Sequence, residues 1–183
     1  MGGAPVKVNF GCGTVQPKGW VNVDRVDYGQ DTIADVLDGL PFPDNSVRYM
    51  VANHSLSDLD HHELGPALRE LRRVLVPGGV LRILVPDLLA AVAAHQRGDA
   101  AWFPLGADLP TVDERLCCFV GWFGTARSQW TYRYAATLLL ATAGFLAVAG
   151  ARPHRPSPLS KEGSLIHTLD DRAVQALIVE ARK

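Results

Sequence analysis

The chain has 183 residues, a length typical of one domain. Hydrophobic residues make up 48% of it and charged residues 20%, which excludes a globally disordered chain. The formal net charge of −1 gives no bulk electrostatic reason to expect a nucleic acid or a membrane surface as partner. We therefore expect one domain, residues 1–183, with neither of those partners.

The cysteine pattern indicates the compartment. Cys12, Cys117 and Cys118 are three in number, two of them adjacent, and no Cys-x-x-Cys pair is present. Adjacent cysteines pair poorly with each other, so a disulfide framework is not expected. Met1 to Phe10 lacks a basic segment followed by an apolar run, so no signal peptide is expected. Both features favour a reduced, cytoplasmic protein.

The first half of the chain predicts four strands and a helix. Leu64, Leu68, Leu71 and Leu75 recur every three or four residues, as on the buried face of a helix, and Pro77-Gly78-Gly79 is expected to end it. The strands are short apolar runs bounded by turn residues. They are expected at Val6–Phe10, Trp20–Asp24, Thr32–Leu37 and Val47–Asn53.

The second half continues the alternation of strands and helices. Residues 98–130 are rich in aromatic side chains and are expected to form a lid or a substrate-binding insertion. The alternation predicts an α/β fold, with a mostly parallel sheet and helices on both faces. Strands are expected at Val80–Val85, Phe145–Ala151 and towards the end of Ala173–Ala181, and helices at Asp87–His95 and Thr131–Ala143.

One apolar stretch is almost long enough to span a membrane. It covers Tyr134–Ala151, but Thr137, Thr142 and Gly144 interrupt it. A helix that ends at Gly144 and a buried strand after it explain the stretch as well, and we favour that interpretation.

A candidate ligand site begins directly after the first strand. Gly11-Cys12-Gly13 allows a tight turn and a close approach of a ligand to the main chain. Asp24 ends the next strand, where a carboxylate can accept hydrogen bonds from a ribose diol. Only a loop fits between Gly13 and Trp20, so no helix N-terminus is available there for a diphosphate. This pattern favours a nucleoside-containing ligand without a diphosphate.

Four ordered motifs resemble a known family. VNFGCG, PKGWVNVD, ADVLDGLPFPDNSV and LRELRRVLVPGGVLRILVPD are similar to the class I S-adenosylmethionine-dependent methyltransferases. The similarity is closest to a small bacterial branch in which a Pro-x-Gly-Trp loop shortens the first helix. It covers residues 6–97 best. It implies a Rossmann-like methyltransferase domain with S-adenosylmethionine as cofactor.

The resemblance implies roles for particular residues. Gly11–Gly13 would pass under the methionine part and the ribose, and Asp24 would hold the ribose hydroxyls. Asp35 and Val36 would lie near the adenine. The remaining cofactor contacts expected from it are Phe10, Cys12, Arg25, Asn53 and His54.

The sequence departs from the family just after the fourth strand. The branch usually has His-x-Leu-Glu-His there, whereas this chain has His54-Ser55-Leu56-Ser57-Asp58. His54 is a candidate base or substrate-orienting residue because its ordinary pKa lies near neutrality. Asp58 is the second candidate catalytic residue, but an aspartate there is by itself more typical of a helix cap than of a catalyst.

Simpler explanations remain open for these residues. His54 is equally consistent with a structural histidine, and Cys12 fits packing beside the cofactor better than it fits a nucleophile. His61-His62-Glu63 suggests a metal site, but adjacent histidines on a helix point in different directions, so no metal is expected. His167 is a weaker candidate for the substrate rim.

The expected function is methyl transfer from S-adenosylmethionine to an oxygen or nitrogen of a small molecule, such as a sugar or a secondary metabolite. One alternative is an enzyme of this fold with non-methyl acid–base chemistry, suggested by the changed residues after Leu56. The other is a non-catalytic partner subunit with an exposed apolar face around Tyr134–Leu140. A homodimer would use the same face.

Overall fold

The computed structural model describes residues 6–152, 155, 157–159 and 175–183. His167 lies outside the described residues. The helices are α1 (His61–Val74), α2 (Leu88–Gln96), α3 (Val112–Gly121) and α4 (Tyr132–Thr137), joined by the short helical turns η1 (Leu56–Asp58), η2 (Ala100–Trp102), η3 (Trp122–Gly124) and η4 (Leu138–Thr142). The strands are β1 (Val6–Phe10), β2 (Val21–Asp24), β3 (Thr32–Ile33), β4 (Val47–Asn53), β5 (Leu75–Pro86), β6 (Ala147–Gly150) and β7 (Ala176–Arg182).

The seven strands form one sheet in the order β3-β2-β1-β4-β5-β7-β6. β7 runs antiparallel to both β5 and β6, and the other pairs are parallel. The predicted mostly parallel α/β sheet is therefore confirmed. Such a sheet brings the carboxyl ends of β1, β2 and β4 to one edge, where ligands bind in open α/β folds.

Helices α1 and α4, with η4, share one face of the sheet and a single apolar core. Asp60 begins α1 with a capping box, because its side chain accepts from the backbone N–H groups of His62 and Glu63. The leucines expected on the buried side of this helix are fully buried. They belong to the same core as apolar residues of β4 and β5, such as Met50 and Leu81.

On the opposite face, loop residues cover the sheet in the part of the chain that the structure describes. Trp20 packs edge-on against Tyr49, with ring centroids 6.4 Å apart, and the Lys7 ammonium lies 5.3 Å from the Trp20 ring. The short Pro17–Gly19 loop places Trp20 there, where the fold class would normally have its first helix. The predicted truncation of that helix thus agrees with the structure.

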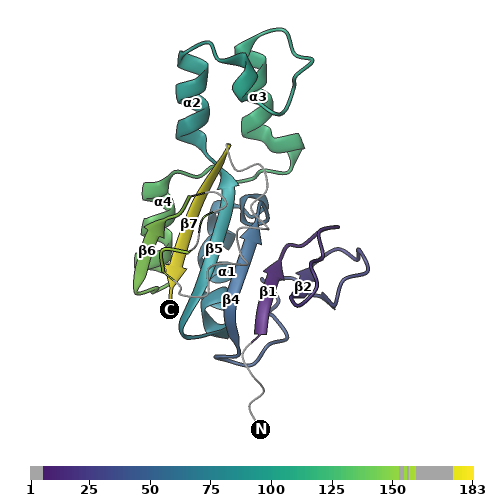
Figure 1. Ribbon diagram of the computed structural model, residues 1–183, viewed down its shortest axis with the longest axis vertical. Helices are drawn as coiled ribbons and strands as arrows, with labels where there is room; N and C mark the ends of the chain where they lie inside the picture. The colour runs from purple at the N-terminus through teal and green to yellow at the C-terminus, as the bar shows by residue number, and fades with distance from the viewer. Residues whose placement is uncertain (1–5, 153–154, 156, 160–174) are drawn as a thin grey trace.

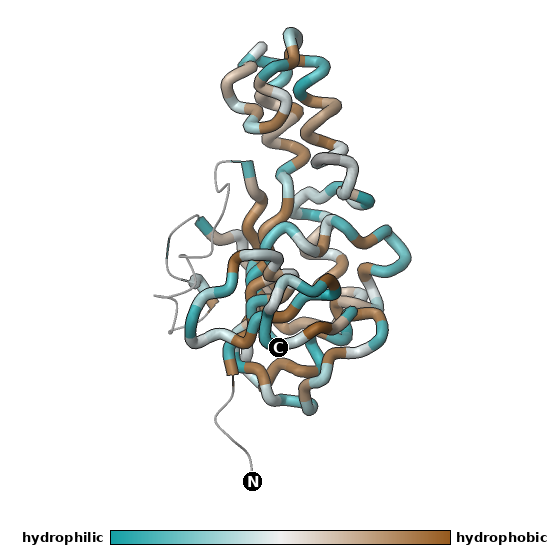
Figure 2. The backbone as a smooth tube through the Cα atoms, turned by 90° about the vertical axis from the view of Figure 1, so that its right-hand side faces the viewer, coloured by the Kyte–Doolittle hydropathy of each residue, from teal (hydrophilic) through white to brown (hydrophobic). Residues whose placement is uncertain are grey.

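Helices α2 and α3 project beyond the carboxyl ends of the strands as an arm (Figure 1). The arm, defined here as residues 88–124, has an apolar core of its own that contains Phe103, Phe119 and Trp122. Apolar segments of α2 and α3 face each other in Figure 2. Most of the aromatic residues predicted in residues 98–130 therefore serve to hold the arm together.

Several boundaries differ from the prediction. The first long helix ends at Val74 rather than at Pro77-Gly78-Gly79, because Val76 precedes a proline and is restricted to extended backbone. β3 stops at Ile33, since the Asp35 side chain accepts from the Leu37 N–H and turns the chain away from the sheet.

The apolar stretch Tyr134–Ala151 forms α4, η4 and β6, as favoured from the sequence. Gly144, with a φ of 78°, makes the turn between helix and strand. No helix among the described residues is long and apolar enough to cross a membrane. Leu138 and Leu139 are buried against α1, so the apolar face expected around Tyr134–Leu140 is largely covered.

Candidate functional site

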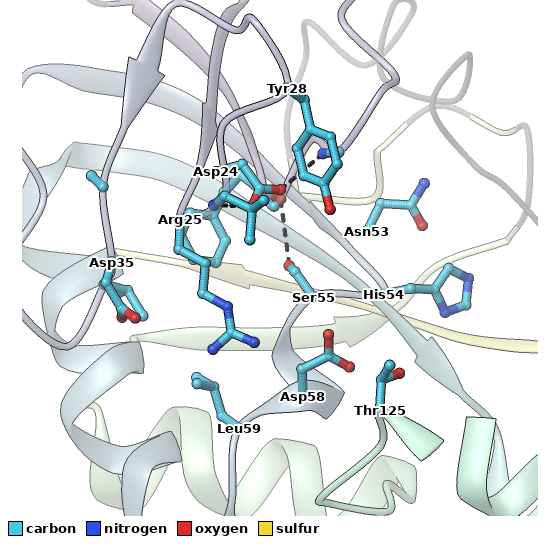
Figure 3. A pocket seen from close by; sticks show the side chains of 16 residues that line it. Asp24, Arg25, Tyr28, Asp35, Asn53, His54, Ser55, Asp58, Leu59 and Thr125 are labelled. Atoms are coloured by element: carbon cyan, nitrogen blue, oxygen red, sulfur yellow. Dashed lines mark hydrogen bonds between the residues drawn. The ribbon is translucent and has the colours of Figure 1, made fainter. Parts of the chain in front are cut away.

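A cavity of about 310 Å³ lies at the carboxyl ends of β1, β2 and β4 (Figure 3). This volume is at the lower end of the range for small-molecule sites. Its walls come from the four segments that follow β1 to β4 and from one residue beyond the arm. The lining residues are Phe10, Gly11, Gly13, Asp24, Arg25, Val26, Tyr28, Ala34, Asp35, Val36, Asn53, His54, Ser55, Asp58, Leu59 and Thr125.

The glycine turn after β1 forms the floor of this cavity. Gly11 and Gly13 have φ values of 65° and 50°, which glycine adopts without strain. A Cβ at Gly11 would lie 2.1 Å from the Cβ of Ser55, so the backbone here directly contacts the segment after β4. Only glycine therefore fits at position 11.

Asp24 ties this turn to the end of β2. Its Oδ2 accepts from the Gly13 N–H at 2.9 Å, and its Oδ1 accepts from the Val26 N–H at 3.0 Å. A carboxylate offers about four lone pairs, so each oxygen retains acceptor capacity for a ligand. The residue that faces the cavity thus also holds the glycine turn in place.

Buried amide side chains support the loop that replaces the first helix. Asn9 donates to the backbone oxygen of Val15 at 2.7 Å and to Asn22 Oδ1 at 3.2 Å. Asn22 donates in turn to Asp31 Oδ2 at 3.0 Å, and hydrogen bonds from Asn22 lower the pKa of Asp31. Sequence reasoning missed this network, although asparagines inside two apolar strands were a visible signal.

His54 and Asp58 lie on the segment that leaves β4. His54 has a φ of 54°, and its ring stacks on Trp122 with centroids 5.0 Å apart and planes at 17°. A backbone strained in this way is found at functional sites more often than elsewhere. The arm therefore reaches the site directly through Trp122.

Asp58 presents a carboxyl group to the cavity (Figure 3). Its Oδ1 is buried and accepts no hydrogen bond from the part of the chain that the structure describes. Desolvation raises the pKa of this carboxyl group, against the smaller lowering effects of a side-chain hydrogen bond with Thr125 and of the Arg25 charge. The alternative interpretation of Asp58 as a helix cap is wrong, because Asp60 caps α1.

The structure brings together every site residue predicted from the sequence except Cys12. The Cys12 side chain is buried beneath the turn, and its Sγ contacts the Gly13 carbonyl oxygen at 3.4 Å. Burial and the nearby Asp24 raise the pKa of this thiol to about 11, which keeps it protonated and argues against a nucleophile. Sequence reasoning missed the lining residues Val26, Tyr28, Ala34, Ser55, Leu59 and Thr125.

No cluster of three or more His, Cys, Asp or Glu side chains in the described ranges is arranged to hold a metal ion. The His61 and His62 rings lie edge to face, and His61 Nδ1 is 2.6 Å from the Tyr134 hydroxyl oxygen. These histidines connect α1 with α4, away from the cavity.

The lining of the cavity fits S-adenosylmethionine. Gly11 and Gly13 line it without side chains, so a ligand can lie close to their backbone. The acceptor atoms of Asp24 face the cavity beside that floor, as a ribose diol requires.

Part of the chain matches a known family in sequence. Residues 17–83 match a family model described as a methyltransferase domain. No protein of curated function matches the sequence at a significant level.

The fold is similar to three solved methyltransferase structures. A SAM-dependent methyltransferase from Archaeoglobus fulgidus is 14% identical with a TM-score of 0.62, over 100% of this chain and 87% of the other. A possible histamine N-methyltransferase from Thermotoga maritima is 15% identical with a TM-score of 0.60, over 99% and 83%. An S-adenosylmethionine-dependent methyltransferase from Mesorhizobium loti is 16% identical with a TM-score of 0.55, over 100% and 92%.

At these identities the three structures establish the fold, and the family model adds the match in sequence. The chain therefore has the fold of these S-adenosylmethionine-dependent methyltransferases, and residues 17–83 match a methyltransferase-domain model in sequence.

Proposed function

We propose that the protein transfers a methyl group from S-adenosylmethionine to an oxygen or nitrogen of a small-molecule acceptor, such as a sugar or a secondary metabolite. The observation that carries this proposal is the shared cavity. One wall holds Gly11, Gly13 and Asp24, which suit the cofactor, and another holds His54 and Asp58, which suit an acceptor with a proton to lose.

The cofactor, when bound, supplies a methyl group already activated by the positive sulfur. Asp24 would accept from the ribose hydroxyls, and the Gly11–Gly13 turn would lie under the methionine part. Asp35 and Val36 would border the adenine. Phe10 and Arg25 would complete the wall at the ends of β1 and β2.

The chain's own contribution is to orient the acceptor, exclude water and receive a proton. Asn53 and His54 border the place where the acceptor would bind, and His54 and Asp58 are the proposed catalytic residues. The stacking of His54 on Trp122 fixes its ring, so it suits an orienting role.

We also propose that residues 98–130 act as a lid within a single domain, residues 1–183. Thr125 lines the cavity and Trp122 stacks on His54, which supports this role. The three free cysteines support the expected cytoplasmic location. A homodimer would use what remains exposed of the face around Tyr134–Leu140, where Leu140 is exposed and Leu138 and Leu139 are buried.

An acceptor screen tests the proposed function. The protein is incubated with S-adenosylmethionine labelled on the methyl group and with separate pools of alcohols, sugars, amines, thiols and carboxylates. Label is expected on oxygen or nitrogen acceptors, and Asp24→Ala should abolish it. Transfer only to carbon or sulfur, or no transfer by protein that binds the cofactor, would overturn the proposal.

A further inference from the structure

The charged groups of the cavity do not cancel. Asp24, Asp35 and Asp58 are carboxylates, and Arg25 is the guanidinium that faces them. A bound S-adenosylmethionine brings one positive sulfonium, while its amino and carboxylate groups cancel each other. Among the described lining residues one negative charge is left without a counter-charge, and such a charge is costly where an atom is screened from water, as the buried Oδ1 of Asp58 is.

The three carboxylates differ in what they already bind. Both oxygens of Asp24 accept backbone N–H groups, and Asp35 Oδ1 accepts from the Leu37 N–H at 2.9 Å. Asp58 has a side-chain hydrogen bond with Thr125, but its Oδ1 is buried and accepts no hydrogen bond from the described residues. A buried oxygen without a donor is rare in folded proteins and calls for a specific explanation.

The position of Asp58 indicates which ligand would supply that donor. Asp58 ends η1, after β4, and Figure 3 shows its carboxylate directed into the cavity between Arg25 and Thr125. This wall lies on the far side of β1 from Asp35, which follows β3. On the proposed binding of the cofactor, with adenine near Asp35, the donor to Asp58 belongs to the acceptor.

We propose that the acceptor is an amine, and that Asp58 binds its ammonium form and removes the proton. This inference rests on the proposed function and deepens it. The N–H of the ammonium donates to Asp58 Oδ1 and then transfers its proton to the carboxylate. The freed electron pair on nitrogen forms the new bond to the methyl carbon. The bond from that carbon to sulfur breaks, and its electron pair remains on sulfur.

Two physical effects make this proton transfer easier. Desolvation raises the pKa of Asp58 and lowers the pKa of a bound ammonium, which brings the two values closer, whereas the attraction between the two charges acts in the opposite direction. A carboxylate or phosphate acceptor would instead place a second anion against Asp58. Anionic acceptors are therefore disfavoured at Asp58, and an alcohol would leave the extra negative charge uncompensated.

Binding of two cofactor analogues tests the inference without turnover. Sinefungin carries an amine where S-adenosylmethionine carries its methyl-bearing sulfur, and S-adenosylhomocysteine carries a neutral sulfur there. Calorimetric titration of the wild-type protein should show that sinefungin binds at least ten-fold more tightly than S-adenosylhomocysteine. Asp58→Asn should remove this preference while leaving the affinity for S-adenosylhomocysteine unchanged.

Asp27→Asn is the matched control. It removes the same charge from the loop after β2, keeps an acceptor for the Gly29 N–H, and does not line the cavity, so the preference should persist. Equal binding of both analogues by the wild type, or a preference that survives in Asp58→Asn, would overturn the amine inference. Neither result would contradict the proposed function. Failure of the wild type to bind either analogue would contradict the proposed function, and the amine inference with it.

The acceptor screen provides the second arm. Label confined to amines supports the inference. Label confined to alcohols or sugars would overturn it while leaving the proposed function intact.

Discussion

Gly11 is the position at which the backbone and the proposed cofactor site constrain each other most strongly. Its φ of 65° and the 2.1 Å that would separate an added Cβ from Ser55 are separate obstacles to any side chain. Gly29 has a φ of 77° with no atom within 4 Å of such a Cβ, so it isolates the backbone effect. The pair therefore separates conformational strain from steric exclusion.

We expect Gly29→Ala to lower the free energy of unfolding by about 1–2 kcal/mol, the cost of a left-handed non-glycine residue. Gly11→Ala should cost more and should abolish S-adenosylhomocysteine binding. Adding Ser55→Gly removes the clashing Cβ and should restore part of the stability. Urea unfolding and calorimetric titration measure both effects, and equal losses in the two alanine variants would contradict the steric argument.

The Asp58 carboxylate should lower the stability of the folded protein, although it serves the proposed reaction. Desolvation raises its pKa in the folded protein, so its ionised form disfavours folding. Asp58→Asn should therefore raise the melting temperature at pH 7. The gain should shrink as the pH falls through the raised folded-state pKa, and should vanish below the ordinary aspartate range. Thermal unfolding across pH checks this, and a gain that is independent of pH would contradict the assignment.

At the scale of elements, the segment after the arm is anchored to the site. The Ser57 carbonyl oxygen accepts from the N–H groups of Arg127 and Ser128, at 2.8 and 3.1 Å. The Arg127 guanidinium binds Asp60 at 2.7 Å and Glu63 at 3.1 Å, which are the two residues of the α1 capping box. This anchor holds Thr125 next to Asp58.

Removal of the Arg127 side chain should change local order more than stability. Arg127 is half exposed, so Arg127→Ala should lower the free energy of unfolding by less than about 1 kcal/mol. Hydrogen exchange of the amides at residues 125–128 should become faster. Arg97→Ala, which removes an exposed pair 3.8 Å from Asp99 within the arm, should leave those amides unchanged. Unaltered exchange in Arg127→Ala would contradict the anchoring role.

At the scale of the whole molecule, a buried network of charged and polar side chains joins β4 and β5, at the centre of the sheet, to β7, the last strand in the chain. Arg82 on β5 and Glu180 on β7 are fully buried and lie 2.7 Å apart. The Tyr49 hydroxyl donates to Glu180 at 3.1 Å, and Ser157 donates to its other oxygen. The antiparallel strand β7 is thereby tied to β4, β5 and the loop after β6.

Removal of the positive charge from this network should destabilise the folded protein. Arg82→Met leaves the Glu180 charge buried without its counter-ion, so the free energy of unfolding should fall by about 3–5 kcal/mol. Adding Glu180→Gln removes that charge while keeping acceptors for Tyr49 and Ser157, and should recover part of the loss. Urea unfolding of both variants decides this, and a double variant no more stable than the single one would contradict it.

The order of strands and helices could be predicted because the apolar periodicity of this chain is strong. The cap of α1, the support of the glycine turn and the position of Thr125 depend on tertiary contacts, which a local sequence pattern does not show. The sequence offers both Asp58 and Asp60 as the N-cap of α1, and the structure shows that Asp60 is the cap. The support for the glycine turn comes from Asn9 and Asn22, residues thirteen positions apart whose contact only the sheet creates. Thr125 reaches the cavity through the anchor at Ser57, which no local pattern indicates.

The central claim is that Asp24 and the glycine turn form the cofactor site of a methyltransferase. Calorimetric titration with S-adenosylmethionine and S-adenosylhomocysteine tests it most directly, with Asp24→Ala as the variant and Asp27→Ala as the control. We predict micromolar binding by the wild type and the control, and at least ten-fold weaker binding by Asp24→Ala, which corresponds to about 1.4 kcal/mol. Absence of binding by the wild type, or unchanged affinity in Asp24→Ala, would contradict the account.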